Sequence, residues 1–487
     1  MDAKTNFAAE TLRGTFWTYA AYLSGKVLVF ISTVILARLL TKDDFGVVGY
    51  ALVTISLLDV LSDLGVGPAL IYERENPKTA DTAFWLGLLV STGLFFLAWL
   101  IAPLAGLYFN DERAIPVIRV LALTFPISAL SNIHDSLLRK NLAFKNRFVP
   151  DFARSVSKGV FSILFAVLGF GAWSLIFGQL AGTLTTVLAY WKVLPWRPSF
   201  NFIRKTANSL LSYGINIVSV DALATLLLNV DYLFVGRFMG ATALGVYSLA
   251  FRIPDLLITQ FCNVISKVVF PVYVRMRDES HNLTHGFLMT LQYVSIVTVP
   301  LSIGLALVSK PFVLTFLTQK WNDAISVMQA ISIYALLFSL SYNAGSLYKA
   351  QGHPETLTRL ALLRLAILVP ALYWATTRFG TITAVGWTHA AVALLVGAIN
   401  LYVAGRMINV PFKTILGALR PAFVSGLLMA LVVLWVLNIT ASITSLMQLL
   451  VATTMGALVY IAALMLQIQN LFREVRQIFR AAVRGES

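Results

Sequence analysis

The sequence has a single cysteine and few charged residues, and each shortage excludes a class of protein. Only Cys262 is present among 487 residues, so an internal disulfide and a multi-cysteine metal site are excluded. Charged residues make up 12%, whereas a soluble domain carries about 25%. No Gly-rich phosphate loop, metal-ligand cluster or nucleophile constellation is present. We therefore expect no metal, no cofactor and no enzymatic activity.

Long hydrophobic runs fill most of the chain. Hydrophobic residues make up 58% of it and the mean hydropathy is +0.79, which indicates a polytopic membrane protein. Only helices suit runs of this length in lipid, because their backbone groups are satisfied within the segment. The prediction is an all-α fold with about fourteen transmembrane helices, near 15–37, 45–70, 82–107, 115–137, 150–169, 172–191, 208–236, 242–270, 287–308, 324–348, 360–377, 382–404, 420–438 and 445–467.

The distribution of basic residues predicts the orientation. Of 37 Lys and Arg residues, 23 lie in one set of alternate loops and termini, and 8 in the opposite set. The positive-inside rule then places both termini in the cytoplasm. This asymmetry also explains the net charge of +15, so we expect no nucleic-acid partner.

One stretch occurs twice, at an offset of 199 residues. The copies, at 38–52 and 237–251, read RLLTKDDFGVVGYAL and RFMGATALGVYSLAF. A second match, at an offset of 210, pairs AIPVIRVLAL from 114 with AISVMQAISI from 324. Two matches in the same order predict the internal duplication of a multi-helix unit.

The duplication predicts the domain organisation. Residues 1–191 form a six-helix bundle, 192–207 a basic cytoplasmic linker, and 208–404 a second six-helix bundle. Residues 405–487 add two helices and a basic tail. Six spans separate the copies, so the bundles are parallel repeats, and we expect them to form a V around a central cavity. The linker could be amphipathic and lie on the cytoplasmic face.

Basic residues within the spans are the candidate substrate site. Each costs about 2.5–3.5 kcal/mol at a helix centre on insertion scales. Both halves contribute them, and several in one cavity would suit an anionic substrate such as a phosphate. Pairing within the bundle or snorkelling to the interface is the alternative. The candidates are Lys26, Arg154, Lys158, Arg252 and Arg364.

Acidic residues within the spans are candidates for coupling to a proton or sodium ion. A titratable carboxylate in a low-dielectric cavity suits that role. The alternative is that these residues only balance the basic ones. The candidates are Asp59, Asp63, Asp221 and Asp231.

The repeated stretch itself predicts a gate. Arg38 and Arg237 lie at the predicted periplasmic end, where spans 1–2 and 7–8 turn. We expect the two hairpins to face each other, with Gly46 and Gly245 allowing close approach.

Two segments resemble a known family. They are LRGTFWTYAAYLSGKVLVFISTVILARLLTKDDFGVVGYALVTISLLDVLSDLGVGPALIYERE near the N-terminus and FLTQKWNDAISVMQAISIYALLFSLSYNAGSLYKAQGHP in the second half. Both resemble the polysaccharide transporter family of the MOP superfamily, which contains the Wzx-type oligosaccharide flippases and exporters of colanic acid and other exopolysaccharides. The second segment includes Lys320-Trp321 and the turn at Ala350-Gln351-Gly352.

The resemblance implies a transporter of the bacterial inner membrane. Members move undecaprenyl-diphosphate-linked oligosaccharide units between leaflets, for exopolysaccharide or lipopolysaccharide biosynthesis. The implied partners are that lipid-linked oligosaccharide and membrane lipid, with a polysaccharide polymerase and a chain-length regulator as candidate protein partners. A MATE-type drug exporter would need a cavity dominated by carboxylates, and a lipid II flippase would differ only in cargo. A polymerase or ligase would need a large external loop, and no predicted external loop is large.

Overall fold

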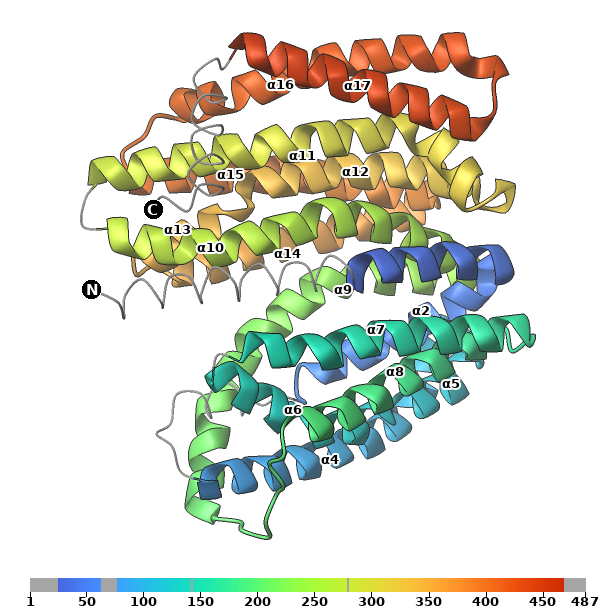
Figure 1. Cartoon of the computed structure of the whole chain (residues 1–487), viewed down its shortest axis with the longest axis vertical. Coiled ribbons are helices and arrows are strands. Elements are labelled where there is room, and N and C mark those ends of the chain that lie inside the picture. The colour runs from blue at the N-terminus through green and yellow to red at the C-terminus, as the bar shows by residue number, and fades with distance from the viewer. Residues whose placement is uncertain (1–24, 63–76, 142, 278–279, 468–487) are drawn as a thin grey trace. The chain divides into compact units, whose positions relative to one another are not determined.

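The computed structural model describes residues 25–62, 77–141, 143–277 and 280–467. Helices account for nearly all of them, and no strand occurs in these ranges (Figure 1). The all-α prediction is confirmed. By packing, the chain divides into two compact units, Met1–Ser248 and Leu249–Ser487.

The first unit begins with a helix over 25–39 and continues through α2 to the first part of α9. Within it, α7 packs on α8, α8 on α6, α6 on α4, and α2 on α5. The helices are α2 (Lys42–Asp59), α4 (Pro77–Phe109), α5 (Ala114–Leu121), α6 (Thr124–Lys140), α7 (Phe144–Val167), α8 (Ala172–Val193) and α9 (Arg204–Pro254).

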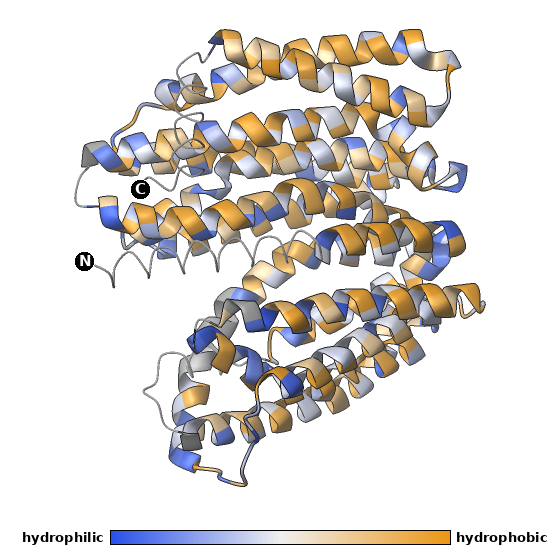
Figure 2. Ribbon diagram, in the orientation of Figure 1, coloured by the Kyte–Doolittle hydropathy of each residue, from blue (hydrophilic) through white to orange (hydrophobic). Residues whose placement is uncertain are grey.

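The second unit is built around α11, which packs on α12, α16 and α17. Hydrophobic residues cover most of α16 and α17 (Figure 2). Its elements are η1 (Asp255–Thr259), α10 (Gln260–Met276), α11 (Ser280–Phe316), η2 (Gln319–Trp321), α12 (Asp323–Tyr342), α13 (Ala344–Ala350), α14 (Glu355–Trp374), η3 (Ala375–Phe379), α15 (Ile382–Met407), α16 (Phe412–Ile439), η4 (Thr440–Ser442) and α17 (Ser445–Gln467).

Each predicted span overlaps one helix or consecutive helices in the described residues. Ten helical stretches there are long and apolar enough to cross a membrane. One of them, Asp221–Met276, contains two predicted spans joined by a turn. The other three predicted spans correspond to the helix over 25–39 and to α2 and α7, which carry several charges. The first of these spans, 15–37, lies only partly within the described residues. Many helices extend past the predicted limits.

The turn inside α9 lies at Gly240, with φ 81° and ψ −178°. That conformation is essentially restricted to glycine. Gly240 is the repeat equivalent of Thr41, which caps the start of α2 and accepts a hydrogen bond from the Asp44 amide. Both copies of the repeat therefore form the predicted helix–turn–helix.

The linker between α8 and α9 has no helix over 194–203. It is pinned instead to the start of α4, where the Ser199 amide donates to Asp81 at 3.1 Å. The unit boundary falls after Ser248, within the predicted second bundle, because the first part of α9 packs with the first unit. The domain limits and the arrangement of two bundles about a cavity stay predictions.

Candidate functional site

The two copies of the repeated stretch meet within the first unit, where α2 crosses the part of α9 that follows Gly240. A Cβ added to Gly46 would lie 1.8 Å from the Ala241 carbonyl oxygen. One added to Gly245 would lie 1.9 Å from the Lys42 carbonyl oxygen. Only glycine fits at either position, because the backbones touch directly.

This contact is reciprocal. At the repeat offset of 199 residues, Lys42 is equivalent to Ala241 and Gly46 to Gly245. Gly46 therefore packs against Ala241, which is the equivalent of Lys42, four residues before Gly46. In the same way, Gly245 packs against Lys42, which is the equivalent of Ala241, four residues before Gly245. Asp43 and Thr242 are also equivalents, and the Thr242 hydroxyl lies 3.5 Å from an Asp43 carboxylate oxygen. The helices cross about a local pseudo-two-fold axis, as in an isologous interface.

A polar network surrounds this end of the crossing. Arg113, in the loop between α4 and α5, forms ion pairs with both Asp43 and Asp111. The Arg113–Asp111 distance is 2.7 Å. Hydrogen bonding from Arg113 holds the pKa of the Asp111 carboxyl below its usual value, and the two carboxylates raise the pKa of Arg113. Asp111 is therefore ionised at neutral pH, and Arg113 links α2 to the α4–α5 loop.

Arg237 joins the end of α4 to the turn region of α9. Its guanidinium donates to the carbonyls of Leu107 (3.2 Å) and Tyr108 (2.6 Å), and to the Asn110 side chain (2.9 Å). A cation at a helix C-terminus is favourable, because the last carbonyls lack helical partners. Arg38, its repeat equivalent, is exposed. Two of the four gate candidates form the crossing and Arg237 braces it, while a gating role stays a prediction.

Three of the five basic candidates lie in the first unit. Gly25, beside Lys26, packs on Ser155 of α7, since a Cβ added to Gly25 would lie 3.5 Å from the Ser155 hydroxyl. Lys26 and Arg154 are thus on adjacent helices at one level; Lys26 is half-buried and Arg154 exposed. Lys158 lies at the α7–α8 contact, with its Cβ 3.0 Å from a Cβ placed on Gly182.

The other two basic candidates lie in the second unit. Arg252 is exposed near the end of α9. Arg364, on α14, donates to the Tyr334 hydroxyl at 2.9 Å. Its guanidinium carbon lies 5.8 Å from the centre of the Tyr334 ring and 5.2 Å from that of Phe338. Cation–π contacts of this kind lower the cost of a buried guanidinium and hold its plane in a fixed orientation.

The acidic candidates differ sharply in burial. Asp59 and Asp221 are exposed, and Asp63 lies outside the described residues. Asp231 is 1% exposed and accepts a hydrogen bond of 2.7 Å from the buried Tyr247 hydroxyl. Tyr247 lies beyond the Gly240 turn, so this bond joins the two helices of the second repeated hairpin.

Sequence reasoning missed several residues of these sites. The sequence patterns did not indicate Arg113, Asp43 or Tyr247 as site residues. Asp43 had one signal, its position within the repeat. Tyr334 and Phe338 were also missed, and their spacing of four residues on a predicted helix was the available signal. In the described part of the chain, no group of three His, Cys, Asp or Glu residues could hold a metal ion.

Known proteins resemble the chain over most of its length. It is 24% identical to the teichuronic acid biosynthesis protein TuaB of Bacillus subtilis, over 93% of this chain and 94% of TuaB. It is 24% identical to the succinoglycan biosynthesis transport protein ExoT of Rhizobium meliloti, over 97% of this chain and 96% of ExoT. The lipid II flippase MurJ, in an inward closed conformation, shares the fold: TM-score 0.78, 16% identity, 93% of this chain and 99% of that one. The sequence profile of the family described as polysaccharide biosynthesis protein matches residues 35–326, more than half of the chain. The chain is therefore a multi-pass membrane protein that belongs to the polysaccharide biosynthesis protein family.

Proposed function

We propose that the chain is a flippase that moves undecaprenyl-diphosphate-linked oligosaccharide units across the bacterial inner membrane by alternating access. The units would serve exopolysaccharide or lipopolysaccharide biosynthesis. The observation that carries the proposal is the family match over residues 35–326. The transport function in the name of ExoT, which aligns over 97% of this chain, supports it.

The basic residues of the spans supply the chemistry that this cargo requires. A lipid diphosphate brings negative charge into the membrane, and its oxygens accept hydrogen bonds from guanidinium and ammonium groups. Arg364 is already oriented by Tyr334 and Phe338, so little side-chain entropy is lost when it binds. Lys26, Arg154, Lys158 and Arg252 are the further groups that engage the diphosphate in this mechanism.

In this mechanism the glycine crossing is part of the periplasmic gate. Direct backbone contact at Gly46 and Gly245 closes that end of the first unit, and the Arg113 and Arg237 contacts hold it shut. Opening requires the two hairpins to separate. Asp231 is the carboxylate best suited to coupling, because it is buried whereas Asp59 and Asp221 are exposed.

The proposed location is the inner membrane, with both termini in the cytoplasm. The polymerase and the chain-length regulator that act on the flipped units are the expected protein partners. The cargo would meet them on the periplasmic side.

A transport assay tests the proposal. The protein, in proteoliposomes, is given a lipid-diphosphate-linked oligosaccharide with a fluorescent sugar, and a membrane-impermeant quencher reports which leaflet holds the sugar. We expect the wild type to flip it, and R154Q/R364Q to lose at least about tenfold in rate, equivalent to ~1.4 kcal/mol.

A matched variant controls for the loss of charge. K349Q/R359Q removes two exposed basic residues, one on α13 and one on α14, that are not among the candidates, and it should transport normally. Undiminished transport by R154Q/R364Q would disprove the substrate role of these residues. Failure of the wild type to move any lipid-diphosphate cargo would disprove the function.

A further inference from the structure

The linker between α8 and α9, which we call the strap (residues 194–203), is rigidly fixed although it has no regular structure. The Trp85 indole donates to the Ser199 carbonyl at 2.9 Å. The Ser199 amide and hydroxyl both donate to Asp81. Farther along, the Ile203 amide donates to the Thr82 hydroxyl at 3.2 Å. Three residues in the first turns of α4 thus determine the path of the strap.

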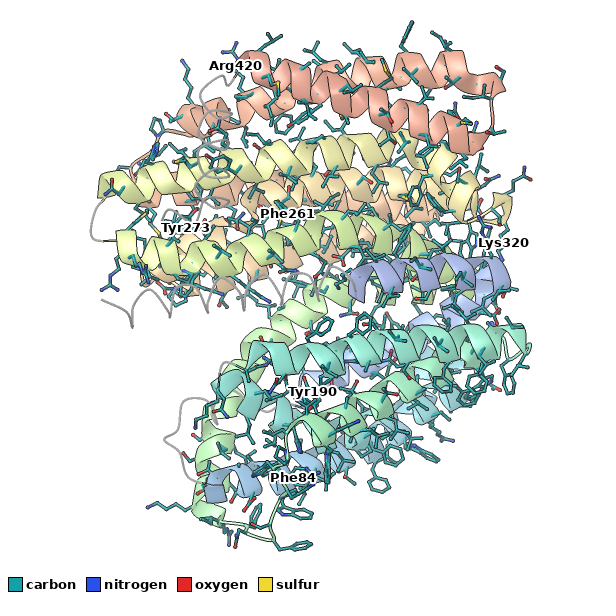
Figure 3. All side chains as sticks on the ribbon, viewed as in Figure 1. Phe84, Tyr190, Phe261, Tyr273, Lys320 and Arg420 are labelled. Carbon is teal, nitrogen blue, oxygen red and sulfur yellow. The ribbon has the colours of Figure 1, made fainter. Side chains whose placement is uncertain are left out.

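The strap is also built into the packed part of the first unit. Trp196 packs edge-on against His134 of α6 and Phe84 of α4, which is labelled in Figure 3. The Arg197 guanidinium donates to the carbonyls of Trp191 and Trp196 and lies over the Trp191 ring. These contacts fix both ends of the segment that carries its exposed residues.

Two phenylalanines on this fixed segment point away from the protein. Phe200 is 92% exposed, although its ring stacks on Trp85 with 5.0 Å between centroids. Phe202 is 53% exposed. A solvated loop gains nothing from holding a phenylalanine outward on a hydrogen-bonded support. An aromatic wedge at the membrane–water interface does, because the ring enters the apolar boundary while the backbone stays at headgroup level.

The charged residues of the linker itself are all basic. Residues 192–205 contain four basic residues and no acidic one. Lys192, Arg204 and Lys205 are exposed and free of the carbonyl contacts that occupy Arg197. The positive-inside rule places this basic segment, residues 192–205, at the cytoplasmic surface.

We propose that the strap and the basic residues that flank it form a binding site for anionic phospholipid of the cytoplasmic leaflet. Phe200 and Phe202 enter the acyl boundary, and Lys192, Arg204 and Lys205 bind the phosphate headgroups. Because Arg204 and Lys205 begin α9, bound lipid fixes the start of the helix that leads into the second half of the chain. The site is separate from the cargo site and does not depend on the flippase function.

A fluorescent probe beside Phe200 tests the proposal on the full chain. Asn201 is replaced by cysteine in a C262A background, labelled with the fluorophore NBD and placed in nanodiscs. Nanodiscs contain trace spin-labelled phosphatidylglycerol or spin-labelled phosphatidylcholine as the quencher. We expect phosphatidylglycerol to quench about threefold more than phosphatidylcholine, and the preference to fade in high salt.

Variants separate the two parts of the site. K192Q/R204Q/K205Q should bring the two quenchers to equal efficiency, while F200S/F202S should weaken quenching by both. F200W/F202W keeps the wedge and should retain quenching, which distinguishes a lost contact from a misfolded strap. K349Q/R359Q/K413Q, which removes three exposed basic residues elsewhere, should leave the preference unchanged.

Three results would overturn the proposal. The first is equal quenching by the two lipids in the wild type. The second is an equal loss of preference in K349Q/R359Q/K413Q, which would indicate a general charge effect. The third is the absence of quenching by either lipid, which would place the strap in water or against a protein.

Discussion

Replacing Gly46 by alanine should force the helix crossing apart by a calculable distance. The new Cβ would lie 1.8 Å from the Ala241 oxygen, and real Cβ contacts essentially never fall under 3.0 Å. The partner atom is backbone, so no side chain can move aside and the helices must separate by ~1.2 Å. Overpacking of this kind costs about 1–3 kcal/mol. The same reasoning for Gly245, which starts from 1.9 Å, gives ~1.1 Å.

The reciprocal geometry makes a sharper prediction about the double variant. A separation that relieves the clash at Gly46 also relieves the one at Gly245, because both arise between the same two helices. G46A/G245A should therefore be destabilised by little more than either single variant, within about 0.5 kcal/mol, rather than by their sum. The assay is unfolding in mixed detergent micelles titrated with SDS. Gly87→Ala is the matched control, since nothing lies within 4 Å of its added Cβ. Additive effects, or a G46A variant as stable as G87A, would refute the reasoning.

Four further predictions concern the same unit. D231N should abolish ion-gradient-driven transport in proteoliposomes while cargo binding persists. Y247F removes the 2.7 Å hydrogen bond from Tyr247 to Asp231 and should lower the free energy of unfolding by about 1–3 kcal/mol in the SDS titration. Unimpaired gradient-driven transport by D231N would exclude the coupling role. Gly240→Ala should cost about 1–3 kcal/mol in the same titration, because φ 81° with ψ −178° is strained for alanine; an unchanged midpoint would contradict this. The ion pair between Arg113 and Asp111 contributes its full stabilisation at pH values above the ordinary Asp111 pKa of 3.8. That stabilisation is lost as the pH falls through the lowered pKa that Asp111 has in the folded state. The difference in melting temperature between wild type and R113Q should thus be constant from about pH 5 to 8 and shrink below about pH 4, and a difference that varies across the neutral range would argue against this pair.

The spans could be predicted because hydrophobic length is a direct physical requirement of the bilayer. The turn at Gly240 could be predicted as well, because the repeat and the break between two apolar runs both indicated it. Two short π-helical segments, η1 and η3, could not. The first interrupts the long helix from α9 into α10, and the second ends the helix of α14 before Gly380; no local sequence pattern records either. The strap was predicted as basic and interfacial, but its lack of helix follows from the hydrogen bonds to α4.

The site was less predictable than the fold. Sequence reveals that a charge in a span is costly, but not which way its side chain points. The stripe containing Arg154 and Lys158 illustrates the limit. Arg154 is exposed, whereas Lys158, one turn away, lies against Gly182 of a neighbouring helix. The partners of Arg364 come from a helix 30 residues earlier in the chain, and only the fold brings them together.

The contact between the glycines of the repeat could be predicted from the sequence for a physical reason that does not apply to the charged residues. Two copies of one sequence that meet about a two-fold axis present the same surface to each other, so any position near the axis must suit its own equivalent. Glycine satisfies that condition at Gly46 and Gly245, since neither copy has a side chain to exclude the other. Where side chains rather than backbones meet, the copies can differ, and Asp43 opposite Thr242 shows that they did. A glycine shared by both copies therefore indicated a direct backbone contact between them, whereas a shared charge such as Arg38 and Arg237 did not indicate a shared partner.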